Sequence, residues 1–364
     1  MSRTIFFLLS SCALCLGADT MTLKQDEKIV FYPAIAQRVP GKDAWRIGIQ
    51  GLIYEPEKRG ITLAVVREAL DLKDIELPPA EEKIFNDRAR LFLVDHERGK
   101  RIFVRIGEKV FAARKSKADG SFAGEFLLSS SEVRRWRDKD ENGNWRLYYA
   151  AELPSSDTRE FSGEVLLLEE TGLSVISDID DTIKITEVRD RKATLRNTFA
   201  REFRPVPGMA DFYQRLAKER SATFHYISAS PWQLYEPLAD FVQANKFAAG
   251  TFSLKEFRWK NRTALSLFAD PEKYKPTVIE PLLKQFPKRR FILIGDSGER
   301  DPEIYAALAR KFPEQIERIY IRDVTHEAAD SPRYQQTFRG LPGGLWKIFT
   351  RPEELELPTA TPSR

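Results

Sequence analysis

The sequence predicts an α/β protein in which a three-layer parallel sheet follows an antiparallel, β-sandwich-like domain. Two different patterns along the 364 residues support this prediction. From about residue 28 to 170 the chain consists mainly of short strand-like runs separated by turns, a pattern typical of antiparallel sheets. After about residue 171, strand-like and helix-like runs alternate. Such alternation implies parallel strands joined by crossover helices.

The first half is expected to hold a series of strands and one helical insertion. The predicted strands are 45–55, 89–95, 100–107, 109–116, 120–128, 145–153 and 161–169. Ala-Asp-Gly at 118–120 and Glu-Asn-Gly-Asn at 141–144 stand where hairpin turns are expected. Residues 61–72 fit a helical period better than an alternating one.

The second half is expected to alternate regularly. Its predicted strands are 173–180, 222–230, a weaker 248–257, 289–297 and 316–324, and its predicted helices are 208–219, 233–246, 276–286 and 302–312. The sequence therefore predicts a β-rich domain over 19–170, a parallel α/β domain over 171–350 and a flexible tail over 351–364.

The first 18 residues differ in composition from the rest. Arg3 is followed by an apolar, uncharged run and then by small residues, which is typical of a secretory signal peptide. Two interpretations remain open: ordinary cleavage near Ala18, or lipidation at Cys12 within a lipoprotein-like box. Either predicts export to the periplasm or the cell surface. No later stretch is long and apolar enough to be expected to span a bilayer.

The charge balance favours no nucleic-acid partner. A net charge of +4 is small for this length. The basic stretch at 134–137 is either a solvated face around Trp136 or a weak contact for an anionic surface such as a membrane.

Carboxylates follow two of the predicted strands. Asp178 and Asp180 end the strand at 173–180, and Asp296 and Asp301 follow the strand at 289–297. If these strands are neighbours in a parallel sheet, the four side chains converge on one crevice. Carboxylates so close would raise one another's pKa, and a hard cation removes that conflict. The sequence therefore predicts a Mg²⁺ site.

The spacing of the first pair adds a chemical prediction. Residues two apart share a side of an extended chain, but a loop that starts at the strand end can turn Asp180 away from Asp178. One carboxylate can then attack phosphorus while the other protonates the leaving oxygen, because the two groups act at opposite ends of the reacting axis.

These residues resemble the motifs of a known enzyme superfamily. Asp178-x-Asp180-x-Thr182 resembles the first motif of the haloacid dehalogenase superfamily. Ser228, at the end of a predicted strand, resembles the second motif, a hydrogen-bond donor to the phosphoryl group. The resemblance implies a Rossmann-like, three-layer fold. It implies that Asp178 is nucleophile and metal ligand, that Asp180 is general acid and base with its carbonyl on the metal, and that Thr182 positions Asp180.

The remaining motifs occur in the same order. Lys275 resembles the third motif, a cation that balances the phosphoryl charge, and Gly-Asp-Ser-Gly-Glu-Arg-Asp at 295–301 resembles the fourth. The resemblance implies that Asp296 and Asp301 bind the metal. Asp181 receives no role and is expected to cap or solvate the loop.

A narrower resemblance covers about 171–330. Residues 175–186, 195–199, 226–235 and 291–305 together resemble the catalytic domain of the actin-patch-protein family of phosphatidate phosphatases. The resemblance implies Mg²⁺-dependent removal of phosphate from phosphatidate. The gaps between motifs are short for a large cap, which predicts an open, nearly capless site. Trp232, Tyr235 and Trp259 either flank that opening or pack between the helices and the sheet.

Two other functions remain open at this stage. An exported acid phosphatase of broad specificity, acting on soluble phosphomonoesters or phosphoproteins, would share every catalytic residue. A non-catalytic phosphatidate-binding module would be expected to lack Asp180, which is present here.

Overall fold

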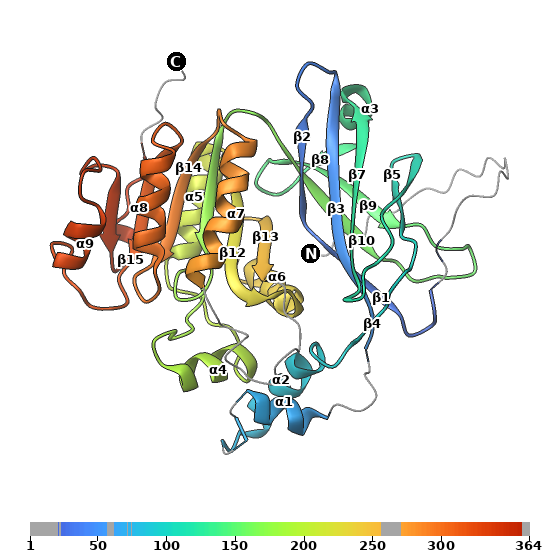
Figure 1. The fold of residues 1–364 in the computed structure, drawn as a ribbon, viewed down its shortest axis with the longest axis horizontal. Helices are drawn as coiled ribbons and strands as arrows, with labels where there is room; N and C mark the ends of the chain where they lie inside the picture. Colours follow the sequence, from blue (N-terminus) through green and yellow to red (C-terminus); the bar gives the residue numbers. More distant parts are fainter. Residues whose placement is uncertain are drawn as a thin grey trace.

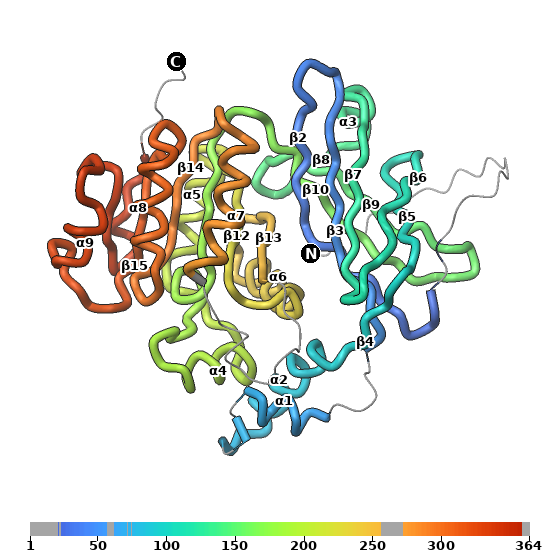
Figure 2. Tube along the Cα trace, viewed as in Figure 1, coloured from blue at the N-terminus to red at the C-terminus, as the bar shows by residue number. Residues whose placement is uncertain are grey.

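The structure is a computed structural model that describes residues 21, 23–56, 62–70, 72–73, 75–255 and 271–358. It is a mixed α/β protein with one parallel and one mainly antiparallel sheet, as the sequence predicts (Figure 1). The Cα trace in Figure 2 shows the two sheets side by side, with α1 and α2 lying near α4 at one end. The predicted signal peptide and Cys12 lie outside the described residues.

The N-terminal sheet is built around one long strand. Its strands are β1 (Lys28–Tyr32), β2 (Ala34–Arg38), β3 (Ala44–Glu55), β4 (Asp95–His96), β5 (Phe103–Ile106), β6 (Lys109–Ala112), β7 (Ser121–Ser129), β8 (Arg137–Lys139), β9 (Trp145–Ala151) and β10 (Ser162–Leu168). The strand β3 pairs with β1, β2, β4 and β7. Among the described strands of this sheet, only β2 and β10 pair in parallel. Gly120 and Gly143 have positive φ at the predicted turns.

The helices of this half differ in part from the prediction. The helix α1 (Leu63–Ala69) lies within the predicted insertion, but α2 (Pro79–Arg90) and α3 (Ser130–Trp136) were not predicted. The predicted strand at 89–95 is wrong, because α2 extends to Arg90 and only β4 begins at Asp95. Buried Phe85, Ala89 and Phe92 recur at intervals of four and three residues, which is a helical period.

The second sheet is wholly parallel in its described pairs. Its strands are β11 (Leu173–Asp178), β12 (Thr223–Pro231), β13 (Gly250–Lys255), β14 (Arg290–Asp296), β15 (Ile316–Arg322) and β16 (Trp346–Phe349), in the order β13-β12-β11-β14-β15-β16. Its helices are α4 (Arg191–Phe199), α5 (Met209–Arg220), α6 (Tyr235–Ala244), α7 (Pro271–Gln285), α8 (Asp301–Lys311) and α9 (Pro332–Thr337). The strand order reverses between β11 and β14, which creates a crevice at their carboxyl ends.

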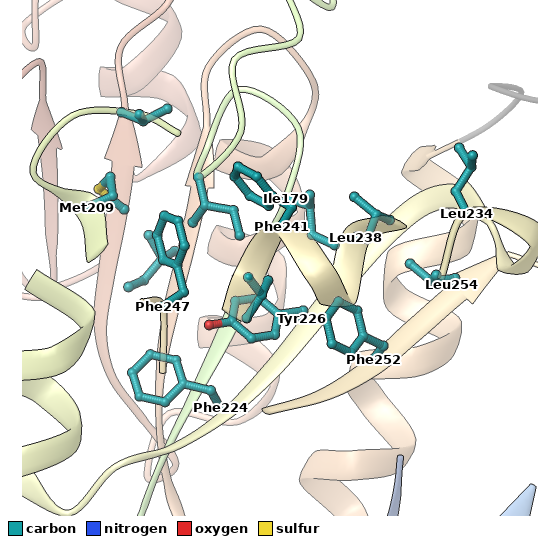
Figure 3. Packing of buried hydrophobic residues seen from close by; sticks show 14 of the residues in the cluster. Ile179, Met209, Phe224, Tyr226, Leu234, Leu238, Phe241, Phe247, Phe252 and Leu254 are labelled. Carbon is teal, nitrogen blue, oxygen red and sulfur yellow. The ribbon is translucent and has the colours of Figure 1, made fainter. Parts of the chain in front are cut away.

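Both faces of the parallel sheet are covered. Val175 packs with residues of α5 and α6, whereas its neighbour Ile176 packs with residues of α7 and α8. Figure 3 shows part of the core on the side of α5 and α6, which contains Tyr226 and Phe252 of the sheet and Phe241 of α6. A parallel strand that is covered on both faces is apolar along most of its length, which is why these strands could be predicted from the sequence.

The two sheets share a core at β10. Val165 and Leu167 pack within the N-terminal sheet, whereas Leu166 and Leu168 pack with α7 and α8. This division follows from the alternation of side chains along a strand. A second contact is made by Tyr32 of β1, whose ring stacks on Trp232 with centroids 4.1 Å apart.

The predicted flexible tail is wrong for residues 351–358. Pro352 and Leu355 are buried, and the Tyr320 hydroxyl donates a 2.7 Å hydrogen bond to the carbonyl of Glu356. This segment therefore packs on the parallel sheet, while residues 359–364 lie outside the described part of the chain.

Candidate active site

The carboxyl ends of β11 and β14 carry the predicted acidic residues. Asp178 is the last residue of β11 and Asp296 the last of β14, and these strands are hydrogen-bonded neighbours. Asp301 is the first residue of α8, and Lys275 lies on α7. All four side chains are almost completely buried, so the fold brings them together as the sequence predicts.

Lys275 links this cluster. Its Nζ lies 2.9 Å from Asp178 Oδ1 and 3.0 Å from Glu299 Oε2, and it also pairs with Asp301. Burial lowers the pKa of Lys275, but Asp178, Asp301 and Glu299 outweigh burial and leave its pKa raised. The cation therefore stays charged inside the protein.

Three of the carboxylates fit a metal ion. Asp178, Asp296 and Asp301 each offer an oxygen, and these oxygens all lie within 4.8 Å of one another. Asp296 Oδ2 is buried and has no hydrogen-bond partner among the described residues. Burial raises the pKa of Asp178 and of Asp296, and neighbouring carboxylates raise both further. Buried oxygen ligands with unmet charge are the environment that Mg²⁺ satisfies.

Asp180 lies in a separate environment. Its Oδ1 is 2.7 Å from Lys184 Nζ and accepts a 2.8 Å hydrogen bond from Thr186, while Oδ2 accepts one of 2.9 Å from Ser228. Ser230 donates to the same oxygen at 3.3 Å. Burial raises the pKa of Asp180, but Lys184 and the hydroxyl donors outweigh burial and leave its pKa below the ordinary value.

Hydrogen bonds made by Thr182 and Asp181 fix the loop after β11. Thr182 donates a 2.8 Å hydrogen bond to Asp178 Oδ2, so it positions Asp178 and not Asp180, the residue that the resemblance implied. Asp181 has a positive φ of 54°. Its carboxylate accepts hydrogen bonds from the backbone N–H groups of Thr186, Glu187 and Val188. Asp181 therefore caps the loop from a buried position.

The glycines of the fourth motif make room for its carboxylates. A Cβ at Gly295 would lie 2.2 Å from Asp301 Oδ2, and one at Gly298 would lie 2.9 Å from Asp296 Oδ1. The N–H of Gly298 instead donates a 2.6 Å hydrogen bond to Asp296 Oδ1. Only a residue without a side chain permits this approach.

Sequence reasoning missed four polar residues at this site. Lys184, Thr186 and Ser230 surround Asp180, and Glu299 pairs with Lys275. All four lie within or directly beside the recognised motifs, in "DTIKIT", "SAS" and "GDSGER". Proximity to a motif was the available signal, but hydrogen-bond partners depend on loop conformation.

Asp180 lies beside a small cavity. A cavity of about 20 Å³ is lined by Asp180, Thr186, Val188, Thr194, Ser228, Ala229, Ser230 and Glu299. Thr194 belongs to α4, so this helix and the loop before it line the cavity beside Asp180. The predicted open, nearly capless site stays a prediction.

Of the two alternatives for the aromatic residues, Trp232 and Tyr235 follow packing, since both lie against the core that α5 and α6 form with the parallel sheet. Trp232 and Tyr235 pack on Tyr32 of the N-terminal sheet, with ring centroids 4.1 and 5.1 Å from it. They belong to the contact between the two sheets. Trp259 lies outside the described residues.

Part of the sequence is similar to that of known proteins. Residues 173–323 match the family described as "Phosphatidate phosphatase APP1, catalytic domain". The chain is 34% identical over 196 residues to phosphatidate phosphatase APP1 of Saccharomyces cerevisiae. The resemblance to the APP1 catalytic domain is confirmed. A second relative, an uncharacterised protein of Schizosaccharomyces pombe, is 33% identical over 183 residues.

The similarity is partial on both sides. It covers 53% of this chain and 33% of the Saccharomyces APP1 protein, and 49% and 30% for the Schizosaccharomyces relative. Among solved structures, a sialyltransferase from Photobacterium damsela matches with a TM-score of 0.21 and 10% identity, over 65% of this chain and 41% of that one. A likeness that weak carries no argument about the fold.

The predicted export is wrong. One of the relatives that the chain matches is an APP1 phosphatidate phosphatase, of the family named for actin patches, which are cytoplasmic structures. Among the described helices, none combines the length and the apolar character needed to cross a bilayer.

Proposed function

We propose that this chain is a Mg²⁺-dependent, phosphatidate phosphatase-like phosphomonoesterase that works through an aspartyl-phosphate at Asp178. The convergence of Asp178, Asp296, Asp301 and Lys275 at the ends of β11 and β14 carries the proposal. The match of residues 173–323 to the APP1 catalytic domain supports it. Residues 171–350 would then form a Rossmann-like, haloacid dehalogenase-like domain, preceded by a β-rich domain over 19–170.

The metal would be held by Asp178, Asp296, Asp301 and the backbone carbonyl of Asp180. Bound there, Mg²⁺ would offset the charge of the carboxylates and of the phosphoryl oxygens. Lys275 would balance the phosphoryl charge from the side of α7, since its Nζ already contacts Asp178. Ser228 would donate a hydrogen bond to a phosphoryl oxygen, which requires it to leave Asp180 Oδ2.

In the first step an oxygen of Asp178 attacks phosphorus, and the bond from phosphorus to the ester oxygen breaks. Asp180 gives its proton to the departing oxygen, which leaves as diacylglycerol when the substrate is phosphatidate. In the second step Asp180 takes a proton from water, the water oxygen attacks phosphorus, and the carboxylate of Asp178 is released with inorganic phosphate.

The ion pair between Asp180 and Lys184 favours the base role. A carboxylate 2.7 Å from a buried ammonium resists protonation. The acid role therefore requires this pair to loosen as the leaving oxygen arrives. Water and leaving oxygen would approach from the cavity that Asp180, Ser228 and Glu299 line.

Phosphate release tests the proposal. The full chain would be assayed with and without Mg²⁺ on short-chain phosphatidate in mixed micelles and on a panel of soluble phosphomonoesters. Release from phosphatidate well above the panel, and lost on chelation, is the expected result. Comparable release across the panel would replace the lipid by a broad phosphomonoester specificity. Binding of phosphatidate without release from any substrate would contradict catalysis.

A further inference from the structure

The helix α2 belongs to the N-terminal half of the chain but packs on the catalytic half. Phe85 and Ala89 of α2 lie in the same core as Leu195 and Phe199 of α4. The rings of Phe92 and Phe199 lie 5.6 Å apart. Figure 1 shows α1 and α2 beside α4, away from the N-terminal sheet. The helix α2 therefore supports α4, which lines the cavity beside Asp180.

Polar contacts fix where α2 meets α4. Glu81 of α2 accepts hydrogen bonds from Arg196 at 2.6 Å and from Arg201 at 3.1 Å. Arg88, only 7% exposed, donates to the backbone carbonyls of Thr198 at 2.9 Å and of Arg201 at 2.6 Å. Those carbonyls lie at the carboxyl end of α4, where helix carbonyls lack partners and carry partial negative charge.

From the end of α4 the hydrogen bonds continue to the catalytic loop. Arg201 Nη1 donates to Asn197 Oδ1 at 3.1 Å, and Asn197 Nδ2 donates to the carbonyl of Thr186 at 3.1 Å. Thr186 Oγ1 in turn donates to Asp180 Oδ1 at 2.8 Å. Asn197 and Thr186 are 3% and 1% exposed, so water does not compete for these bonds.

We propose that Arg88 is a positioning residue for the phosphatase reaction, acting through α4, Asn197 and Thr186 on the orientation of Asp180. This inference rests on the proposed function. It gives the N-terminal half a role that the isolated parallel sheet could not supply: α2 closes α4 over the cavity around Asp180 and fixes the loop of residues 180–186.

The chemistry of Arg88 supports a positional role beyond packing. Placing a guanidinium in a buried position costs desolvation energy that an apolar side chain would not. Its planar donors and its stacking on Phe203, 3.8 Å from the ring centroid, hold it in one orientation. A side chain so constrained sets the register of α4 against α2.

Kinetics of full-length variants test the inference. The substrate is the phosphomonoester that the wild-type chain releases fastest in the panel above. Arg88→Met should lower kcat about tenfold, because a displaced Asp180 fails in proton transfer, while KM changes less than about twofold. Arg88→Lys should recover part of kcat. Arg90→Met is the matched control, since Arg90 is 65% exposed on the same helix.

A double-mutant cycle separates positioning from general destabilisation. If Arg88 acts through Asn197, the Arg88→Met/Asn197→Ala variant should be no slower than Asn197→Ala alone. Multiplying effects on kcat, or an Arg88→Met kcat equal to that of Arg90→Met, would overturn the inference. If Arg88→Met does not fold, by circular dichroism, the same cycle with Arg88→Lys decides. A wild-type chain inactive on every phosphomonoester would overturn the proposed function and this role together.

Discussion

Lys275 Nζ lies 2.9 Å from Asp178 Oδ1, and both side chains are almost completely buried. A buried ion pair is tolerated because each charge offsets the desolvation of the other, and removing one partner leaves the other uncompensated. This pair therefore couples the stability of the fold to the geometry of the candidate active site.

Lys275→Met is expected to lower the free energy of unfolding by about 3–5 kcal/mol. Urea denaturation measures the change. The double variant Lys275→Met/Asp178→Asn should lose less than the two single variants together, because the orphaned carboxylate is gone. Lys284→Met, at a position 62% exposed on the same helix, serves as control. Strict additivity would contradict the coupling.

Mg²⁺ is expected to stabilise the folded chain. An ion that binds only the folded state at about 100 times its Kd adds about 2.7 kcal/mol, visible as a rise in the thermal midpoint. Asp296→Asn should abolish this rise because Asp296 Oδ2 is the buried oxygen without a partner among the described residues. Asp240→Asn, at an exposed position of α6, should retain it. A thermal midpoint of the wild-type chain that does not change when Mg²⁺ is added would contradict the metal site.

Gly295→Ala tests the packing of the fourth motif. The added methyl would lie 2.2 Å from Asp301 Oδ2, so the carboxylate or β14 must shift. We expect a loss of about 1–3 kcal/mol in stability and at least tenfold in kcat, about the effect of a small misplacement. Gly343→Ala, where a Cβ meets nothing within 4 Å, is the control. Unchanged kinetics in Gly295→Ala would show that Asp301 tolerates displacement.

His225 is expected to limit stability in acid. Burial lowers the pKa of His225 to about 3, and its ring contacts Thr251 at 2.8 Å and Ser174 at 3.1 Å. In the unfolded chain His225 therefore binds a proton below about pH 6.5, whereas in the folded chain it stays neutral at that pH. Its stabilising effect is complete above pH 6.5 and falls as pH drops towards 3, by up to about 1.4 kcal/mol per pH unit.

The pH dependence of unfolding checks this sign. Between pH 6 and 4 the free energy of unfolding of His225→Gln should fall less steeply than that of the wild-type chain, by roughly the slope that one bound proton contributes. The variant should nevertheless be less stable than the wild-type chain at neutral pH. An unchanged slope in His225→Gln would assign the acid loss to other groups.

The sequence was most informative where both sides of a strand are buried. The runs ending at Asp178 and Asp296 are mainly apolar, so their strand character and the convergence of their acidic ends could be predicted. The helix α2 was missed because its buried apolar residues Phe85 and Ala89 run on into Phe92 and so merge with the strand-like run at 89–95. Short mixed patterns do not separate a helix from a strand.

Contacts between distant segments lay beyond the sequence. Nothing in the residues near Arg88 indicates that its guanidinium meets the carbonyls of Thr198 and Arg201, more than 100 positions away. The partner of Thr182 was likewise misassigned, because the turn at Asp181 directs its hydroxyl to Asp178. Side-chain partners depend on loop conformation, which pattern and spacing leave open.

Acid quenching during turnover tests the central claim most directly. Wild-type chain mixed with phosphatidate carrying a labelled phosphate should retain label on the peptide that contains Asp178, only when Mg²⁺ is present. Asp178→Asn should carry no label and release no phosphate, with an unchanged circular dichroism spectrum. An active wild-type chain with its label on another residue, or an Asp178→Asn chain that keeps more than a few per cent of the wild-type rate, would contradict the account.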